Sequence, residues 1–196
     1  MFTFNVLITT VGRPSLVKML DSLKDELLES DCLTIVFDGC KRNTGDLSEF
    51  KCKVNIFEEP IALGFYGHGI RNKYASLLEY RTFVMHADDD DVYFKGAFEI
   101  LRNSCTNPFT LYIGKMLDHE RNIIPKSEDI RKCNIGTPNG IIPYELNMKS
   151  FWKYERGGDG DFYECIKKEQ DLLGNMTVFL PNIIYIVTCR PITWAD

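Results

Sequence analysis

Four consecutive aspartates occupy positions 88–91, directly after an apolar run at 83–87 that is interrupted only by a histidine. Neighbouring carboxylates about 5 Å apart repel by about 1 kcal/mol in water and by about 3 kcal/mol at an effective dielectric near 20. A cation would offset this repulsion. Mg²⁺ and Mn²⁺ are commonly held by one or two carboxylates together with phosphate oxygens. The run therefore predicts a dication site, with a solvated acidic turn before a helix as the alternative.

Alternate residues of an extended segment point the same way, so Asp88 and Asp90 form one pair and Asp89 and Asp91 form the other. Two further polar segments also end predicted strands. Thr9 and Thr10 end an apolar run that begins at position 4, and Asp38 ends one that begins at position 33. Ligands of parallel sheets bind at the carboxyl ends of the strands. We therefore expect the three segments to converge on one crevice, although each is also an ordinary strand-end or turn residue.

The elements that must position these residues follow from the periodicity of apolar side chains. Strands are predicted at 4–9, 33–37, 53–57, 82–87 and 110–115. Helices are predicted from three apolar stripes at helical spacing: Leu16, Leu20, Leu23 and Leu27; Ile70, Tyr74, Leu77 and Leu78; Phe94, Ala97, Phe98 and Leu101. Strands and helices thus alternate through about residue 116. This alternation predicts an α/β fold, with a mostly parallel central sheet and helices on both faces.

The remaining chain, 117–196, is less regular. Turns are predicted at 134–140, a helix at 159–173 and a strand at 178–187. Trp152 and Trp194 are candidates for stacking on a sugar ring or for the core, and Arg190 is a candidate contact of a diphosphate. The sequence ends without an obvious closing element, as expected of one domain cut from a longer polypeptide.

Composition narrows the class of protein. The chain has 196 residues, 44% of them hydrophobic, which is enough to bury the core of a single domain. A net charge of −5 argues against broad binding of nucleic acid or of an anionic membrane. No apolar stretch is long enough to span a bilayer, and the N-terminus lacks the features of a secretory signal. Seven scattered cysteines without a CxxC pair argue against disulfides and zinc, so a cytoplasmic location is predicted.

Four segments, in this order, resemble the GT-A nucleotide-sugar glycosyltransferases, particularly the family 2-like ones. They lie at 9–14, 37–39, 67–72 and 86–91, and the last looks like the DXD motif of that family. The resemblance extends from residue 4 to about 187. It implies a GT-A (Rossmann-like) fold with a nucleotide-binding half at 1–116 and an acceptor-binding half at 117–196. The chain is also similar to the small soluble glycosyltransferase domains with which large algal DNA viruses glycosylate their capsid protein, which would place it in the host cytoplasm.

The resemblance implies a role for each matching residue. Thr9, Thr10 and Arg13 would border the nucleoside pocket. Asp38 would accept hydrogen bonds from the uracil or ribose. Arg71 would neutralise the diphosphate or contact the base, its alternative being an ion pair with a glutamate on its own helix. Asp89 would contact the substrate, Asp88 would reach the ribose or the metal, and Asp90 would be the direct ligand of Mn²⁺ or Mg²⁺.

On the acceptor side, the segment 156–163 resembles the Glu-Asp stretch at the start of the acceptor helix of the family, where an aspartate is the general base of inverting members. Gly158 stands in place of the glutamate, and Asp159 falls on the position of the base. If the enzyme inverts, Asp159 would deprotonate the acceptor hydroxyl; if it retains, Asp159 would bind the acceptor, as Asp161 would. The alternative is that both aspartates only stabilise a helix N-terminus.

The function implied is that of a metal-dependent, hexosyltransferase-type enzyme. It would transfer sugar from a nucleoside-diphosphate sugar, with a UDP-sugar favoured, to a glycan or glycoprotein acceptor. A sugar nucleotidyltransferase is one alternative. Such an enzyme would need a glycine-rich loop after the first strand to bind a triphosphate, but segment 9–14 has only one glycine. The other alternative is a non-catalytic binding module. The only feature of the sequence that favours it is the missing glutamate before Asp159.

Overall fold

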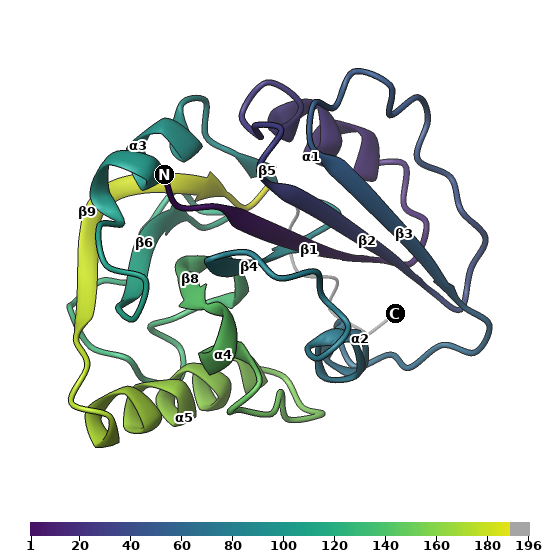
Figure 1. The fold of residues 1–196 in the computed structure, drawn as a ribbon. Helices are drawn as coiled ribbons and strands as arrows, with labels where there is room; N and C mark the ends of the chain where they lie inside the picture. The colour runs from purple at the N-terminus through teal and green to yellow at the C-terminus, as the bar shows by residue number, and fades with distance from the viewer. Residues whose placement is uncertain (189–196) are drawn as a thin grey trace.

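The computed structural model describes residues 1–188, and within them the strands form one curled nine-stranded sheet (Figure 1). The order across the sheet is β3-β2-β1-β4-β8-β6-β9-β5, and β7 pairs with β6. The strands are β1 (Phe4–Thr10), β2 (Cys32–Asp38), β3 (Lys53–Glu59), β4 (Phe83–Asp88), β5 (Val92–Tyr93), β6 (Leu111–Leu117), β7 (Ile123–Ile124), β8 (Gly140–Pro143) and β9 (Thr177–Ile186). The helices are α1 (Leu16–Leu23), α2 (His68–Tyr74), α3 (Ala97–Ser104), α4 (Tyr144–Asn147) and α5 (Gly158–Leu172), with a 3₁₀ turn η1 (Thr137–Asn139).

The N-terminal half of the sheet is parallel and is covered on both faces. Strand β1 lies between β2 and β4 and runs parallel to both, and β3 continues the parallel order beyond β2. Val6 and Ile8 belong to the core cluster that includes side chains of α1 and α3, whereas Leu7 packs in the cluster with α2. Because β1 is buried on both faces, its sequence is apolar throughout most of its length. The predicted α/β fold is confirmed.

The predicted helical stripes are confirmed with two exceptions. All four leucines of the first stripe are buried, although α1 itself ends at Leu23. In the second stripe, Leu77 is exposed, whereas Leu78, which also follows the end of α2 at Tyr74, is buried. In the third, Phe94 is exposed because it precedes the start of α3 at Ala97.

Strand β8 was not predicted, and it connects the two halves of the sheet. It pairs antiparallel with β4, where Val84 lies opposite Ile142, and antiparallel with β6, where Tyr112 lies opposite Ile141. The sequence predicted only turns just before it, because β8 has four residues and begins and ends with glycine and proline. The antiparallel insertion makes the sheet mixed rather than wholly parallel, and it continues the sheet from β4 to β6 and β9.

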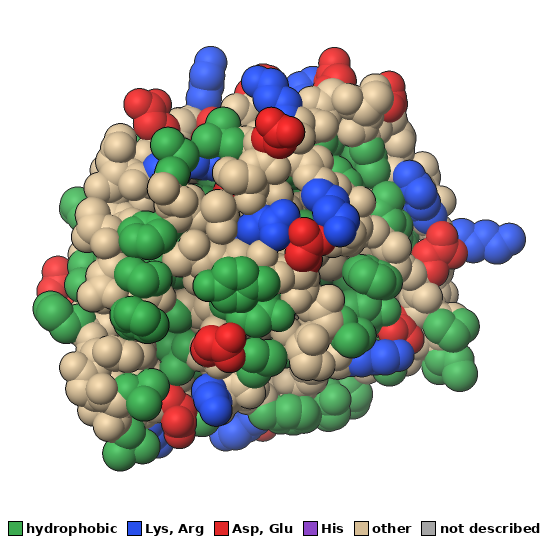
Figure 2. All heavy atoms as spheres, viewed as in Figure 1, with side chains coloured by type: hydrophobic (Ala, Val, Ile, Leu, Met, Phe, Trp, Pro, Cys, Tyr) green, Lys and Arg blue, Asp and Glu red, His purple; other side chains and the backbone are tan. Residues whose placement is uncertain are grey.

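Acidic and basic side chains are interspersed on the face drawn in Figure 2, without a continuous basic area. Across positions 1–188, no helix combines the length and the apolar character that crossing a membrane requires. The six cysteines within these residues are free, and Cys32, Cys52 and Cys105 are buried.

Candidate functional site

The three predicted strand ends meet at one edge of the sheet. In the register of β1 with β4, Thr9 lies beside Asp88, and in the register of β1 with β2, Thr10 lies beside Phe37, one residue before Asp38. The carboxyl ends of β1, β2 and β4 therefore bring the polar segments together, as the sequence predicted.

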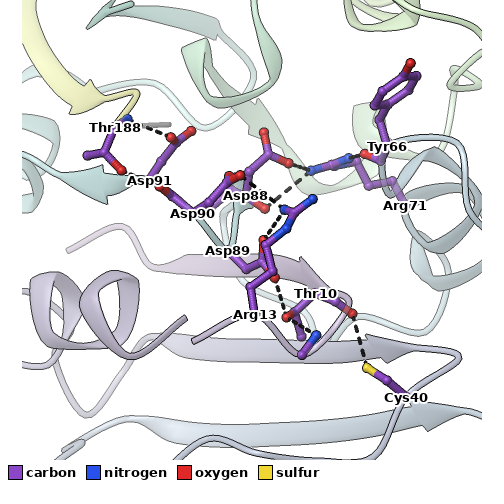
Figure 3. Close-up of polar contacts among 12 residues, drawn as sticks. Thr10, Arg13, Cys40, Tyr66, Arg71, Asp88, Asp89, Asp90, Asp91 and Thr188 are labelled. Carbon is purple, nitrogen blue, oxygen red and sulfur yellow. Dashed lines mark hydrogen bonds and ion pairs between the residues drawn. The ribbon is translucent and has the colours of Figure 1, made fainter. Parts of the chain in front are cut away.

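Asp89 ties the loop after β4 to the end of β1 (Figure 3). Arg13 Nη1 donates to Asp89 Oδ1 over 2.7 Å and to Asp90 Oδ2 over 3.2 Å. Thr10 Oγ1 donates to Asp89 Oδ2 over 2.5 Å and accepts the N–H of Gly12 over 2.9 Å. Asp89 is buried, and both its carboxylate oxygens accept hydrogen bonds. We therefore infer that Asp89 orients Arg13 and Thr10.

Arg71 lies beneath the site with its side chain fully buried. Its Nη2 donates to Asp88 Oδ1 over 2.6 Å, and its Nη1 donates to the carbonyl oxygen of Tyr66 over 2.8 Å. The guanidinium also lies over the ring of Trp152, 5.1 Å from the centroid. The expected alternative, an ion pair with a glutamate on the same helix, is therefore not the arrangement found.

Gly67 allows the loop before α2 to approach the end of β1. Its φ of +80° lies in the left-handed region that favours glycine. A Cβ at this position would also overlap the hydroxyl of Thr9 and come within 2.9 Å of Arg71 Nη1. The glycine is thus required both by the backbone conformation and by the close approach to the two predicted site residues.

The two carboxylates of the predicted metal site are partly open to solvent. The side chain of Asp88 is 34% exposed and that of Asp90 is 24% exposed. Each uses one oxygen for an arginine, and among the described residues the other oxygen has no hydrogen-bond partner. Burial, followed by the charge of Asp88, raises the pKa of Asp90, which means that added positive charge would be favourable here.

Within residues 1–188, no group of three or more His, Cys, Asp or Glu side chains is arranged to hold a metal ion by itself. Two carboxylates, however, match the chemistry of Mg²⁺ or Mn²⁺, which usually take the rest of their ligands from phosphates and water. The donor set at Asp88 and Asp90 therefore fits a dication that arrives with a phosphorylated ligand.

The end of β9 supports the aspartate run from a distant part of the sequence. The N–H of Thr188 donates to Asp91 Oδ1 over 2.9 Å, and the Thr188 hydroxyl donates to the carbonyl oxygen of Asp90. The N–H of Asp88 donates to the hydroxyl of Tyr185 over 3.1 Å. Burial, followed by the charge of Asp88, raises the pKa of Asp91 to about 8. Sequence reasoning missed Tyr185 and Thr188, because no local pattern indicates a contact across 97 residues.

Asp38 holds the segment that follows β3. Its Oδ1 accepts the N–H of Leu63 over 2.6 Å, and its Oδ2 accepts the N–H of Gly64 over 2.8 Å. The carboxylate is buried, so this contact with the backbone is its main interaction within the described residues. The predicted hydrogen bond to a uracil or ribose would have to use the remaining lone pairs.

Asp159 lies in the first turn of α5. Burial raises the pKa of Asp159, the charge of Asp88 raises it further, and Arg71 opposes this. Its Oδ1 accepts the N–H of Gly160 over 2.9 Å. Asp161 instead pairs with Lys153 at 2.5 Å, which lowers the pKa of Asp161. Neither is the N-cap residue, because that position belongs to Gly157, so both lie in the first turn.

Packing explains the glycine at position 158. A Cβ at Gly158 would lie 3.0 Å from Cε1 of His68 and closer still to the carbonyl oxygen of Lys153. The His68 ring is fixed here, since its Nδ1 donates to that same carbonyl over 2.6 Å. A larger side chain would therefore displace the contact between α2 and the segment before α5.

His86 and Trp152 belong to the core. His86 Nε2 donates to Asn147 Oδ1 over 2.8 Å, and burial, followed by the charge of Arg71, lowers the pKa of His86 to about 3. Trp152 is buried and stacks on Phe162 with ring centroids 4.0 Å apart. Of the two placements considered for Trp152, the structure shows the core, and its covered ring is not open to a sugar. Arg190 and Trp194 lie outside the described residues.

No protein-family model and no curated protein sequence matches the chain. Several solved structures, however, superpose on the chain. Residues 1–349 of S. aureus TarS superpose with a TM-score of 0.68 at 17% identity, covering 95% of this chain and 60% of that one. A longer S. aureus TarS structure gives 0.68 at 17% identity, covering 96% of this chain and 37% of that one. TarS 1–349 in complex with UDP-GlcNAc gives 0.64 at 15% identity, covering 97% of this chain and 59% of that one. The chain thus spans about 60% or less of these structures, and the likeness shows that it has the α/β fold of the GT-A glycosyltransferase structures.

Proposed function

We propose that the chain is a metal-dependent glycosyltransferase that moves a sugar from a UDP-sugar to a glycan or glycoprotein acceptor. The observation that carries this proposal is the placement of the partly exposed Asp88 and Asp90 at the carboxyl end of a parallel strand, beside the end of β1. The fold adds support, because one structure that superposes on the chain is a complex with UDP-GlcNAc. UDP-GlcNAc is therefore the first donor to test.

On the donor side, Asp88 and Asp90 would hold Mn²⁺ or Mg²⁺. The bound dication would stabilise the charge that develops on the diphosphate as the glycosidic bond breaks. Arg71 contributes a buried positive charge that fixes the orientation of Asp88. Asp89 holds Arg13 toward the same region, so that Arg13, with Thr9, Thr10 and Asp38, would border the nucleoside. Oriented charges of this kind act without reorganising during the reaction.

On the acceptor side, Asp159 would be the general base of an inverting reaction. A carboxylate whose pKa is raised by burial holds a proton more strongly than an exposed one and so accepts it more readily from a hydroxyl. Asp161, paired with Lys153, would bind acceptor hydroxyl groups. If the reaction retains the anomeric configuration, Asp159 would bind the acceptor instead.

A non-catalytic nucleotide-sugar or glycan-binding module is the second candidate, favoured by Gly158 at the position of the family's glutamate. Metal-dependent hydrolysis of UDP-GlcNAc separates the two, because only the enzyme would release UDP. A sugar nucleotidyltransferase stays an alternative with no observation in its favour. The cytoplasmic location and the similarity to viral capsid-modifying domains stay predictions.

The test is calorimetric titration of UDP, GDP and CDP, with and without Mn²⁺. We expect UDP to bind only with the metal and the Asp90→Ala variant to lose this binding while it unfolds at an unchanged temperature. Asp171→Ala is the matched control, since it removes an exposed acidic side chain at the far end of α5. Retained metal-dependent binding in Asp90→Ala would exclude the metal assignment, and absence of binding by all three diphosphates would exclude the donor assignment.

A further inference from the structure

Three exposed aromatic side chains lie against one another beside the site. We call Phe65, Phe151 and Tyr154 the aromatic platform. Phe65 and Tyr154 are stacked, with ring centroids 4.7 Å apart and planes at 20°, and Phe151 lies edge-on to Tyr154 at 5.4 Å. Phe65 is 53% exposed and Tyr154 is 48% exposed. Large apolar groups gathered on a surface mark a binding site more often than isolated ones do.

The backbone that presents the platform is held in a rare conformation. Phe65 has a φ of +55° and Tyr66 a φ of +58°, both in the left-handed region that bulky residues seldom adopt. Such strain persists only where the surroundings enforce it, and it is concentrated at functional sites. Two sets of hydrogen bonds enforce the conformation here. Arg71 donates to the carbonyl oxygen of Tyr66, and Asp38 accepts the N–H groups of the segment just before Phe65.

The same contacts locate the platform relative to the chemistry. Arg71 joins the carbonyl of Tyr66 to Asp88, so the loop carrying Phe65 is fixed to the aspartate run. The segment carrying Phe151 and Tyr154 leads into α5, which begins with Gly158 and Asp159. The platform is therefore built from two segments, one tied through Arg71 to the proposed metal ligand and the other leading to the helix that carries the proposed general base.

Charged groups that include Lys153, the sequence neighbour of Tyr154, add the polar part of the chemistry that carbohydrate recognition needs. Lys153, next to Tyr154, extends into solvent and pairs with Asp161 at 2.5 Å, with Lys132 on the other Asp161 oxygen at 3.5 Å. A pyranose ring presents C–H groups on its faces and hydroxyls around its edge. The flat rings would contact the C–H face, and the charged pair would bind the hydroxyls.

We propose that the aromatic platform binds a sugar ring of the acceptor, which makes Phe65 and Tyr154 determinants of acceptor specificity. The proposal rests on the proposed function, since it is that function which makes the ligand an acceptor. It requires no change in the binding of the nucleotide, because the platform would contact the second substrate.

The test is saturation-transfer NMR on the whole chain, with UDP and Mn²⁺ present. The probes are methyl glycosides of glucose, N-acetylglucosamine, galactose, mannose and rhamnose, together with cellotriose and chitotriose. We expect at least one probe to receive saturation on the C–H face of one ring. Phe65→Ala combined with Tyr154→Ala should weaken that binding roughly tenfold, whereas Tyr154→Phe, which keeps the ring, should retain it.

Phe109→Ala is the matched control, because Phe109 is an exposed aromatic side chain in a different segment, just before β6. Equal loss in this control, retained binding in the double variant, or absence of signal from every probe would overturn the proposal. Loss of UDP binding in the double variant would also overturn it, since the platform would then hold the base. If UDP fails to bind the unmodified chain while a glycoside still saturates through the platform, the donor assignment fails and the sugar-binding surface stands.

Discussion

Arg71 and Asp88 form an ion pair of 2.6 Å in which the arginine side chain is fully buried and the carboxylate is about one-third exposed. The buried partner comes from α2 and the exposed partner from the end of β4. Because Arg71 also binds the carbonyls of Tyr66 and Ala87, its charge is fixed in position beneath the site. Within residues 1–188, one oxygen of Asp88 is held by Arg71 and the other has no hydrogen-bond partner, which leaves it for a ligand.

Arg71→Met should destabilise the fold by roughly 2–4 kcal/mol, because it leaves two carbonyls and a carboxylate without their donor. The measurement is urea unfolding at neutral pH. Arg131→Met is the control, since Arg131 pairs with Asp129 at the surface and its loss should cost less than about 1 kcal/mol. Similar losses in the two variants would mean that the buried pair contributes no more than a surface pair.

Gly67→Ala should both destabilise the fold and weaken nucleotide binding. The residue combines a φ of +80° with a Cβ position that overlaps the hydroxyl of Thr9. Gly96 is a matched control, because it also precedes a helix, has a φ of +83° and has open space where a Cβ would lie. Gly96→Ala should cost about 1 kcal/mol from the backbone alone, and Gly67→Ala clearly more. Equal unfolding free energies for the two variants would contradict the close approach.

Asp38→Asn should destabilise the fold by about 1–3 kcal/mol, since an amide group would face a backbone N–H where a carboxylate oxygen now accepts. The variant is compared with Asp46→Asn, in which an exposed aspartate accepts a single N–H from Ser48. Urea unfolding gives the stability, and calorimetry gives UDP binding. Weaker binding with unchanged stability would instead favour a direct contact of Asp38 with the nucleoside.

His86 should make stability depend on pH. Its folded-state pKa is lowered to about 3, against an ordinary value near 6.5 in the unfolded chain. Between these values the unfolded state binds a proton that the folded state does not, so the contribution of His86 is complete above about pH 6.5 and is lost as the pH falls toward 3.

The measurement for His86 is the free energy of unfolding of the unmodified chain and of His86→Gln at pH 7.5, 6 and 5. Glutamine does not titrate, and its amide can still donate to Asn147. The difference between the two proteins should therefore shrink as the pH is lowered. A difference that stays constant across this range would show that His86 does not resist protonation in the fold.

The sequence by itself determined the class of fold and the edge of the sheet at which the polar residues gather. Apolar periodicity is a local property, so β1, β2 and β4 can be recognised from their own residues. The carboxyl ends of parallel strands share one edge, which is enough to predict that Thr9, Asp38 and Asp88 approach one another.

Only the tertiary structure decided how each polar group is used. Asp89 is engaged by Arg13 from 76 positions away, and Asp91 by Thr188 from 97 positions away. Which aspartates stay open to a ligand depends on these pairings. The stacking of Phe65 on Tyr154 likewise joins two distant parts of the sequence. Side chains of the same type in one run differ only in the partners that folding brings to them, and no local pattern encodes contacts of such long range.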